Sequence, residues 1–164
     1  AGTYELTITI GGPQLADKLA EQAQHVLSGP VLYRDMPAFR VHYTLEGQDR
    51  TTEDYVDALV TAFKQVYDVQ IKQLGWPAPP PDGGLGGDKR FDIYVANLKS
   101  NADVLYGYAR FEDPAVDGPH RDGFTSYFVI ENDFKEAESG SPLSLLRATL
   151  ATINGIAAGL RNTG

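Results

Sequence analysis

Alternation of hydrophobic and polar residues predicts five β-strands along the chain. In the first, Leu6, Ile8 and Ile10 share one side, while Thr7 and Thr9 occupy the other. This period of two residues is typical of a strand, because successive side chains of a strand point to opposite faces. The predicted strands cover residues 4–10, 38–45, 91–96, 105–109 and 126–130. We expect strand 91–96 to lie in the middle of the sheet.

Hydrophobic residues at three- and four-residue spacing predict three helices, over residues 14–27, 52–74 and 141–158. The middle helix has the clearest boundaries. Thr52 suits the N-cap position, and the acidic Glu53 that follows suits the positive end of the helix dipole. Gly75 and Pro77 end the pattern, as residues that terminate helices commonly do.

The order of these elements predicts an α+β fold, in which a mixed β-sheet packs with three main helices. The 164 residues fit a single domain, 1–164, because domains commonly hold about 100–150 residues. Residues 76–89 contain four prolines and four glycines, so we expect a long loop over 76–90. An interdomain linker is the alternative, although too few residues lie on each side to favour it.

Net charge and composition argue against several classes of binding partner. The net charge is −8, and an acidic protein repels phosphate backbones, so we expect no nucleic-acid partner. No apolar run approaches the roughly 20 residues that cross a bilayer, so we expect no membrane partner. The chain has no cysteine, which excludes disulfides, Cys-ligated zinc and a thiol nucleophile.

The glycine-rich part of the loop offers a weak calcium site. Asp82 and Asp88 flank the glycines, and carboxylate oxygens on a flexible loop are the ligands that calcium prefers. The spacing is not that of an EF-hand. A solvated loop, whose glycines permit positive φ angles, is the alternative interpretation.

Two further sets of residues carry chemical signals. One is an acidic group that suits acid–base work or a solvated surface: Glu131, Asp133, Glu136 and Glu138. The other is the set of three histidines: His25, His42 and His120. We expect His25 near a helix C-terminus and His42 on the polar side of its strand. No two histidines are four residues apart, so no helix carries a histidine pair for zinc.

Small residues recur along the last predicted helix at Ala151, Gly155 and Gly159. Each glycine inside a helix costs about 0.5–1 kcal/mol relative to alanine, so some contact should offset that cost. Tight packing of the helix on its own sheet is one explanation. The other is a docking face for a protein partner or for a second copy, which would make a homo-oligomer.

Six segments together resemble a known family. Residues 39–44, 73–79, 82–84, 87–95, 105–108 and 126–134 are similar, in this order, to the N-terminal part of the catalytic domain of exported bacterial zincin metalloproteases of myxobacterial type. The resemblance covers about residues 39–151. It implies the fold of a zincin-like N-terminal subdomain and a secreted or cell-surface location.

The same resemblance implies that this chain lacks the family's zinc chemistry. The family carries His-Glu-x-x-His directly after the segment that matches residues 146–151, where the histidines hold zinc and the glutamate activates water. The matching positions here are Thr152, Ile153 and Ile156. We therefore expect a non-catalytic domain that acts in binding or assembly with a protein or peptide partner, without a cofactor. The alternative is a fragment or altered form of a secreted zinc metalloprotease that hydrolyses peptide bonds.

Overall fold

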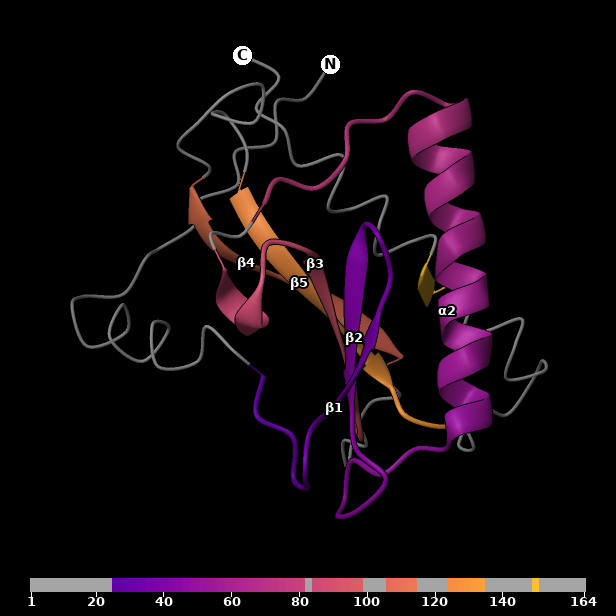
Figure 1. Ribbon diagram of the computed structural model, residues 1–164, viewed down its shortest axis with the longest axis vertical. Helices are drawn as coiled ribbons and strands as arrows, with labels where there is room; N and C mark the ends of the chain where they lie inside the picture. Colours follow the sequence, from indigo (N-terminus) through magenta and orange to yellow (C-terminus); the bar gives the residue numbers. More distant parts are fainter. Residues whose placement is uncertain (1–24, 82–83, 99–105, 115–123, 135–148, 151–164) are drawn as a thin grey trace, which may run out of the picture.

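The computed structural model describes residues 25–81, 84–98, 106–114, 124–134 and 149–150. They form a mixed five-stranded sheet in the order β1-β2-β3-β5-β4, with one long helix, α2, beside it (Figure 1). The strands are β1 Leu32–Asp35, β2 Phe39–Tyr43, β3 Phe91–Ala96, β4 Gly107–Pro114 and β5 Phe124–Glu131. The helical elements are α2 Glu53–Tyr67, a π-helical turn Asp68–Gln73 and a 3₁₀ turn Leu85–Gly87.

Three parallel strands form the middle of the sheet, and antiparallel strands flank them. Val41 of β2 lies opposite Ile93 of β3, and Ile93 lies opposite Phe128 of β5. β1 pairs antiparallel with β2, and β4 pairs antiparallel with β5. Every residue of β3 is buried, as expected of a parallel strand covered on both faces. The central position predicted for this strand is confirmed.

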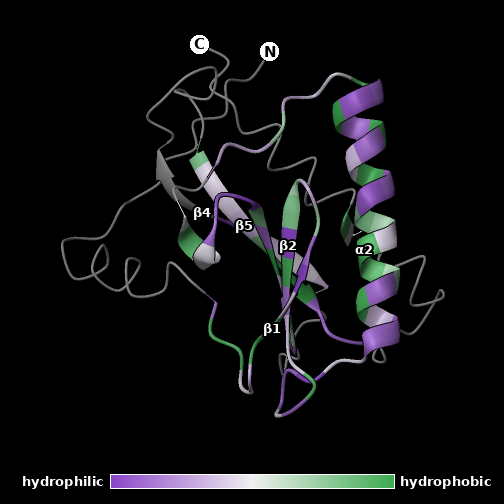
Figure 2. Cartoon of the chain, viewed as in Figure 1, coloured by the Kyte–Doolittle hydropathy of each residue, from purple (hydrophilic) through white to green (hydrophobic). Residues whose placement is uncertain are grey.

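Helix α2 begins where its sequence predicts. The Thr52 side chain accepts a hydrogen bond from the Tyr55 N–H at 3.2 Å, which satisfies one of the unpaired donors of the first turn. The helix passes into the π-helical turn, and Gly75 follows it with a φ of 71°. Hydrophobic and hydrophilic residues alternate along α2 (Figure 2). The hydrophobic ones give the helix its buried side.

The two faces of the sheet carry different layers. On the α2 face, Phe63 meets the edge of Phe39 at a centroid distance of 4.7 Å. This layer also includes Leu150, from the helical residues 149–150. The opposite face carries a smaller layer of Leu27, Tyr94, Ala96, Tyr127 and Val129. Because side chains alternate along β2, Phe39 and Val41 face α2, and Arg40 and His42 face the other way.

The α+β class and the mixed sheet are confirmed, whereas one strand was missed and several boundaries differ from prediction. Residues 25–27 are not helical, so the predicted helix end at Leu27 is wrong; the residues before His25 lie outside the described part of the chain, and its placement near a helix C-terminus stays a prediction. β1 was not predicted. It is short and has no alternating pattern, and it forms through a turn in which the Met36 N–H donates to the Phe39 carbonyl. Residues 112–114 belong to β4, where a loop was predicted, because pairing with β5 extends the strand.

The remaining predicted elements lie outside the described residues. They are the strand over 4–10, most of the first helix and all of the last helix except residues 149–150. Within the described part of the chain, no helix is long and apolar enough to cross a membrane.

Candidate functional site

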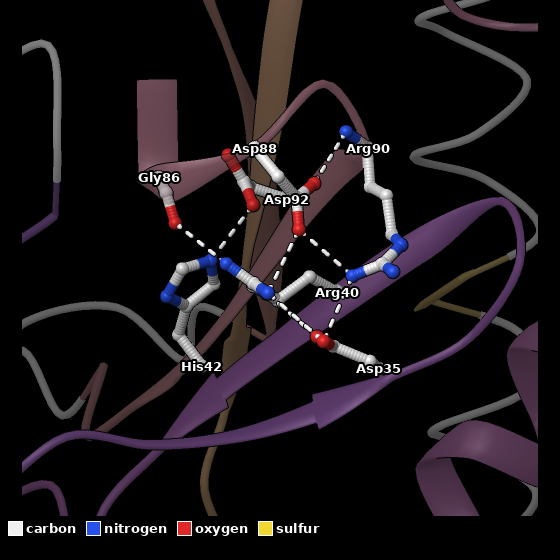
Figure 3. A network of polar contacts seen from close by, with 7 residues as sticks. All are labelled: Asp35, Arg40, His42, Gly86, Asp88, Arg90 and Asp92. Atoms are coloured by element: carbon white, nitrogen blue, oxygen red, sulfur yellow. Dashed lines mark hydrogen bonds and ion pairs between the residues drawn. The ribbon is translucent and has the colours of Figure 1, made fainter. Parts of the chain in front are cut away.

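Polar side chains from β1, β2, β3 and the segment before β3 gather in one cluster (Figure 3). It lies on the face of the sheet opposite α2, because Arg40 and His42 alternate along β2 with the α2-facing Phe39 and Val41. At its base, His42 of β2 and Asp92 of β3 form a hydrogen bond, with 2.7 Å between Nε2 and Oδ1. Each of these residues is only 3% exposed. A polar group buried this deeply is costly unless it is hydrogen-bonded, so each residue needs the other. We call these two residues the His–Asp pair.

Aromatic rings hold the imidazole of the His–Asp pair in place. The Tyr94 ring stacks on His42 with 4.2 Å between centroids and 16° between planes. Tyr33 meets the same imidazole edge-on at 5.1 Å. An imidazole oriented by a carboxylate is an arrangement that performs acid–base chemistry. In this structure, however, burial closes the pair to solutes.

Four charged side chains form an ionic cluster above the His–Asp pair. Arg40 of β2 pairs with Asp35 at 2.6 Å and with Asp88 at 2.8 Å. Arg90 pairs with the same two carboxylates, at 2.9 Å and 2.7 Å. The hydrogen bond from Arg40 lowers the pKa of Asp35 to about 2, and Asp35 in turn raises the pKa of Arg40. The cluster therefore ties the hairpin β1–β2 to the segment 84–90.

The segment 84–90 touches the His–Asp pair through Gly86. A Cβ atom on Gly86 would overlap the Asp92 carboxylate, with Oδ2 as its nearest atom, and the φ of Gly86 is 65°. Only glycine combines this backbone conformation with so close an approach. The Gly86 carbonyl also accepts a hydrogen bond from Arg40 Nη1 at 3.3 Å. The backbone of the segment thus covers the buried carboxylate directly.

The predicted calcium site is not tested by the described residues. Asp82 lies outside them, and the carboxylate of Asp88 is paired with the two arginines Arg40 and Arg90. Among the residues that the structure describes, no three histidines or carboxylates are grouped as a metal ion requires. The charge of Asp88 is already balanced by its neighbours.

Three other predicted residues lie within the described part of the chain and pack against neighbouring segments. Glu131 is 4% exposed, and its Oε2 accepts a hydrogen bond from the Leu98 N–H at 2.7 Å. It thereby holds the chain that follows β3. His25 lies beside Tyr94, with 5.9 Å between the ring centroids, and burial lowers its pKa. Asp133 is half-buried, two residues beyond the end of β5.

Several predicted site residues fall outside the described part of the chain. They are the stripe Ala151, Gly155 and Gly159, the motif positions Thr152, Ile153 and Ile156, and the residues His120, Glu136 and Glu138. Their roles remain predictions.

A second feature is the outer edge of β4. Among the strands that the structure describes, β4 has a neighbour on one side only, which is β5. Two phenyl rings stand near this edge: Phe111 is 41% exposed and Phe124 is 50% exposed. Their ring centroids are 6.4 Å apart. An edge strand beside exposed rings offers both backbone hydrogen bonds and an apolar contact.

Sequence reasoning missed the His–Asp pair because its members are 50 positions apart. Each of the two strands, β2 and β3, nevertheless contained one sequence signal that pointed to the pair. His42 was assigned to the polar side of its strand, and Asp92 interrupts a run of residues that the structure shows to be fully buried. A polar residue inside a buried strand calls for a partner on a neighbouring strand.

Comparisons with known proteins provide no information on the function of this chain. No family model, curated protein or solved structure matched it. The resemblance to zincins therefore stays a prediction.

Proposed function

We propose that this chain is a non-catalytic, zincin-like domain that binds an extended peptide along the outer edge of β4. The observation that carries the proposal is the position of β4 at the end of the described sheet. The outer edge of such a strand presents backbone N–H and C=O groups that a further strand can pair with. Addition of a strand is a common way of binding peptides, because the backbone supplies affinity whatever the peptide sequence.

The first half of β4 is firmly attached to the sheet. It pairs with β5 without interruption from Gly107 to Phe111. Just before it, the Tyr106 carbonyl accepts a hydrogen bond from the Glu131 N–H at 3.0 Å. A strand that is already ordered loses little conformational entropy when a peptide joins it, which favours binding.

Side chains near the edge suggest the character of the peptide. Phe111 and Phe124 would cover an apolar side chain of the ligand, and this burial would add to the backbone hydrogen bonds. The net charge of −8 would draw a basic peptide toward the domain more than an acidic one. We therefore expect a peptide that alternates apolar residues with lysines.

Fluorescence polarisation tests this proposal with labelled decapeptides in which valine alternates with lysine, or with glutamate as the comparison. The valine–lysine peptide should bind, and Phe111→Ala should weaken its binding. Leu32→Ala, on the opposite edge strand β1, is the matched control and should bind normally, since Leu32 is similarly exposed. Absence of binding, or equal loss in both variants, would overturn the proposal.

The alternative is an altered or partial secreted zinc metalloprotease. Its support is the burial of Leu150 in the α2-face layer, two residues before Thr152, the first position that matches the place of the family's zinc motif. Elemental mass spectrometry of protein purified without chelator, followed by a peptide-cleavage assay, separates the two proposals. About one zinc per chain together with cleavage supports the protease. Peptide binding without cleavage supports the binding domain.

A further inference from the structure

We propose that the segment 84–90 is a latch that opens to give solutes access to the His–Asp pair. In the closed state seen here, the backbone of Gly86 lies against the Asp92 carboxylate and Arg40 holds the Gly86 carbonyl. Figure 3 shows the cluster converging on this point from β1, β2 and the segment itself. The latch lies over β2 and β3, whereas the proposed peptide site follows β4, so the two proposals stand independently.

Polar contacts near the surface hold the latch closed. No residue of the segment 84–90 is fully buried. Its ion pairs, from Asp88 and Arg90, involve side chains that are 28% and 34% exposed. Ion pairs that reach water contribute little to stability and weaken in salt. By contrast, the strands β2 and β3 beneath the latch belong to the core.

The backbone of the latch suits movement. Gly84, Gly86 and Gly87 all have positive φ values, in a region where glycine moves freely. The Gly87 N–H donates to the Gly84 carbonyl at 3.2 Å, and the Phe91 N–H donates to the Ala38 carbonyl at 3.3 Å where β3 begins. A segment with few buried contacts opens at a lower free energy than the whole fold.

Opening of the latch would leave the His–Asp pair intact. His42 and Asp92 belong to neighbouring core strands, and Tyr94 would still stack on the imidazole. The exposed imidazole would be oriented by a carboxylate and flanked by the Arg40 guanidinium. Such an imidazole can accept a hydrogen bond from a bound solute through the ring nitrogen that does not contact Asp92. The position of the latch therefore controls whether the His–Asp pair can bind a solute.

A pair of glycine variants tests the latch. Histidine modification by diethyl pyrocarbonate is followed by peptide mass spectrometry, with His25 as the internal reference. Gly86→Ala places a Cβ atom on the Asp92 carboxylate and should speed the modification of His42 about tenfold or more. Gly84→Ala carries at least as much backbone strain, at a φ of 108°, but its Cβ meets no atom within 4 Å. It should leave the rate at His42 near that of the unaltered chain.

Variants that remove charges provide a second test, which does not depend on a steric clash with Asp92. Arg40→Gln, Asp88→Asn and added salt should each speed modification of His42. Arg34→Gln is the matched control, because it removes two ion pairs, to Glu53 and Asp57, that do not touch the latch. Circular dichroism verifies that each variant is folded during the assay. Unchanged modification in Gly86→Ala, Asp88→Asn and salt, or equal acceleration in Gly84→Ala and Arg34→Gln, would overturn the proposal.

Discussion

Arg40 and Asp92 lie directly opposite each other on β2 and β3, yet each makes its closest bond elsewhere. Asp92 bonds to His42 at 2.7 Å, and Arg40 bonds to Asp35 at 2.6 Å. The polar interactions are thereby divided into a buried pair and a more exposed ionic cluster above it. Because burial magnifies the cost of losing a partner, the two groups should respond differently to substitution.

Removal of the Asp92 carboxylate should destabilise the fold more than removal of the Asp35 carboxylate. Asp92→Ala leaves the buried imidazole of His42 without its partner, at a cost of about 1–3 kcal/mol. Asp35→Ala breaks ion pairs whose partners remain near water, at a cost of about 0–1 kcal/mol. Urea unfolding measures both values. Equal losses would show that the His–Asp pair contributes no more than a surface contact.

Stability in acid should depend on Asp35. Its pKa lies at about 2 in the folded protein, below the ordinary value of 3.8, chiefly because of the hydrogen bond from Arg40. A lowered carboxyl pKa stabilises the fold above the unfolded pKa, and this contribution is lost as the pH falls from about 4 to about 2. Melting temperatures across this range should fall less steeply for Asp35→Asn. A parallel decline in both proteins would contradict the prediction.

His25 should make the fold less stable at mildly acidic pH. Burial lowers its pKa below the ordinary value of 6.5, and Arg110 adds to this effect while Asp49 opposes it. The unfolded chain therefore binds a proton more readily, so stability falls as the pH drops below about 6.5. His25→Gln should reduce the difference between urea midpoints at pH 7.5 and pH 5.5. An unchanged difference would show that His25 does not contribute.

The aromatic layer under α2 should be sensitive to truncation. Phe63 is 1% exposed and contacts the rings of Phe39 and Phe128. Phe63→Ala should cost about 3–5 kcal/mol in unfolding free energy, because it leaves a cavity among rings that cannot fully collapse. Leu74→Ala is the control: Leu74 is 60% exposed, so its loss should lie within about 0.5 kcal/mol. Similar values for the two variants would argue against this packing.

The local pattern of residues in the sequence predicted several secondary-structure elements correctly. The alternation over residues 91–96 predicted β3, and the cap at Thr52 with the residues that follow predicted α2, because both signals depend on neighbours in the sequence. The same reasoning missed β1, which has no alternation and depends on its pairing with β2. It also ended β4 early, because the continuation of a strand depends on the partner strand and not on its own residues.

The sequence by itself determined the α+β class, the central strand and the main helix, since hydrophobic period and capping act over a few residues. It also placed His42 on the polar side of its strand. Only the tertiary structure decided the strand order, which brings His42 to Asp92 and Arg40 to Asp88. These contacts join positions about 50 residues apart, and local pattern carries no information on which strands become neighbours. The physical cause is the joint burial of several strands and one helix, which no single segment specifies.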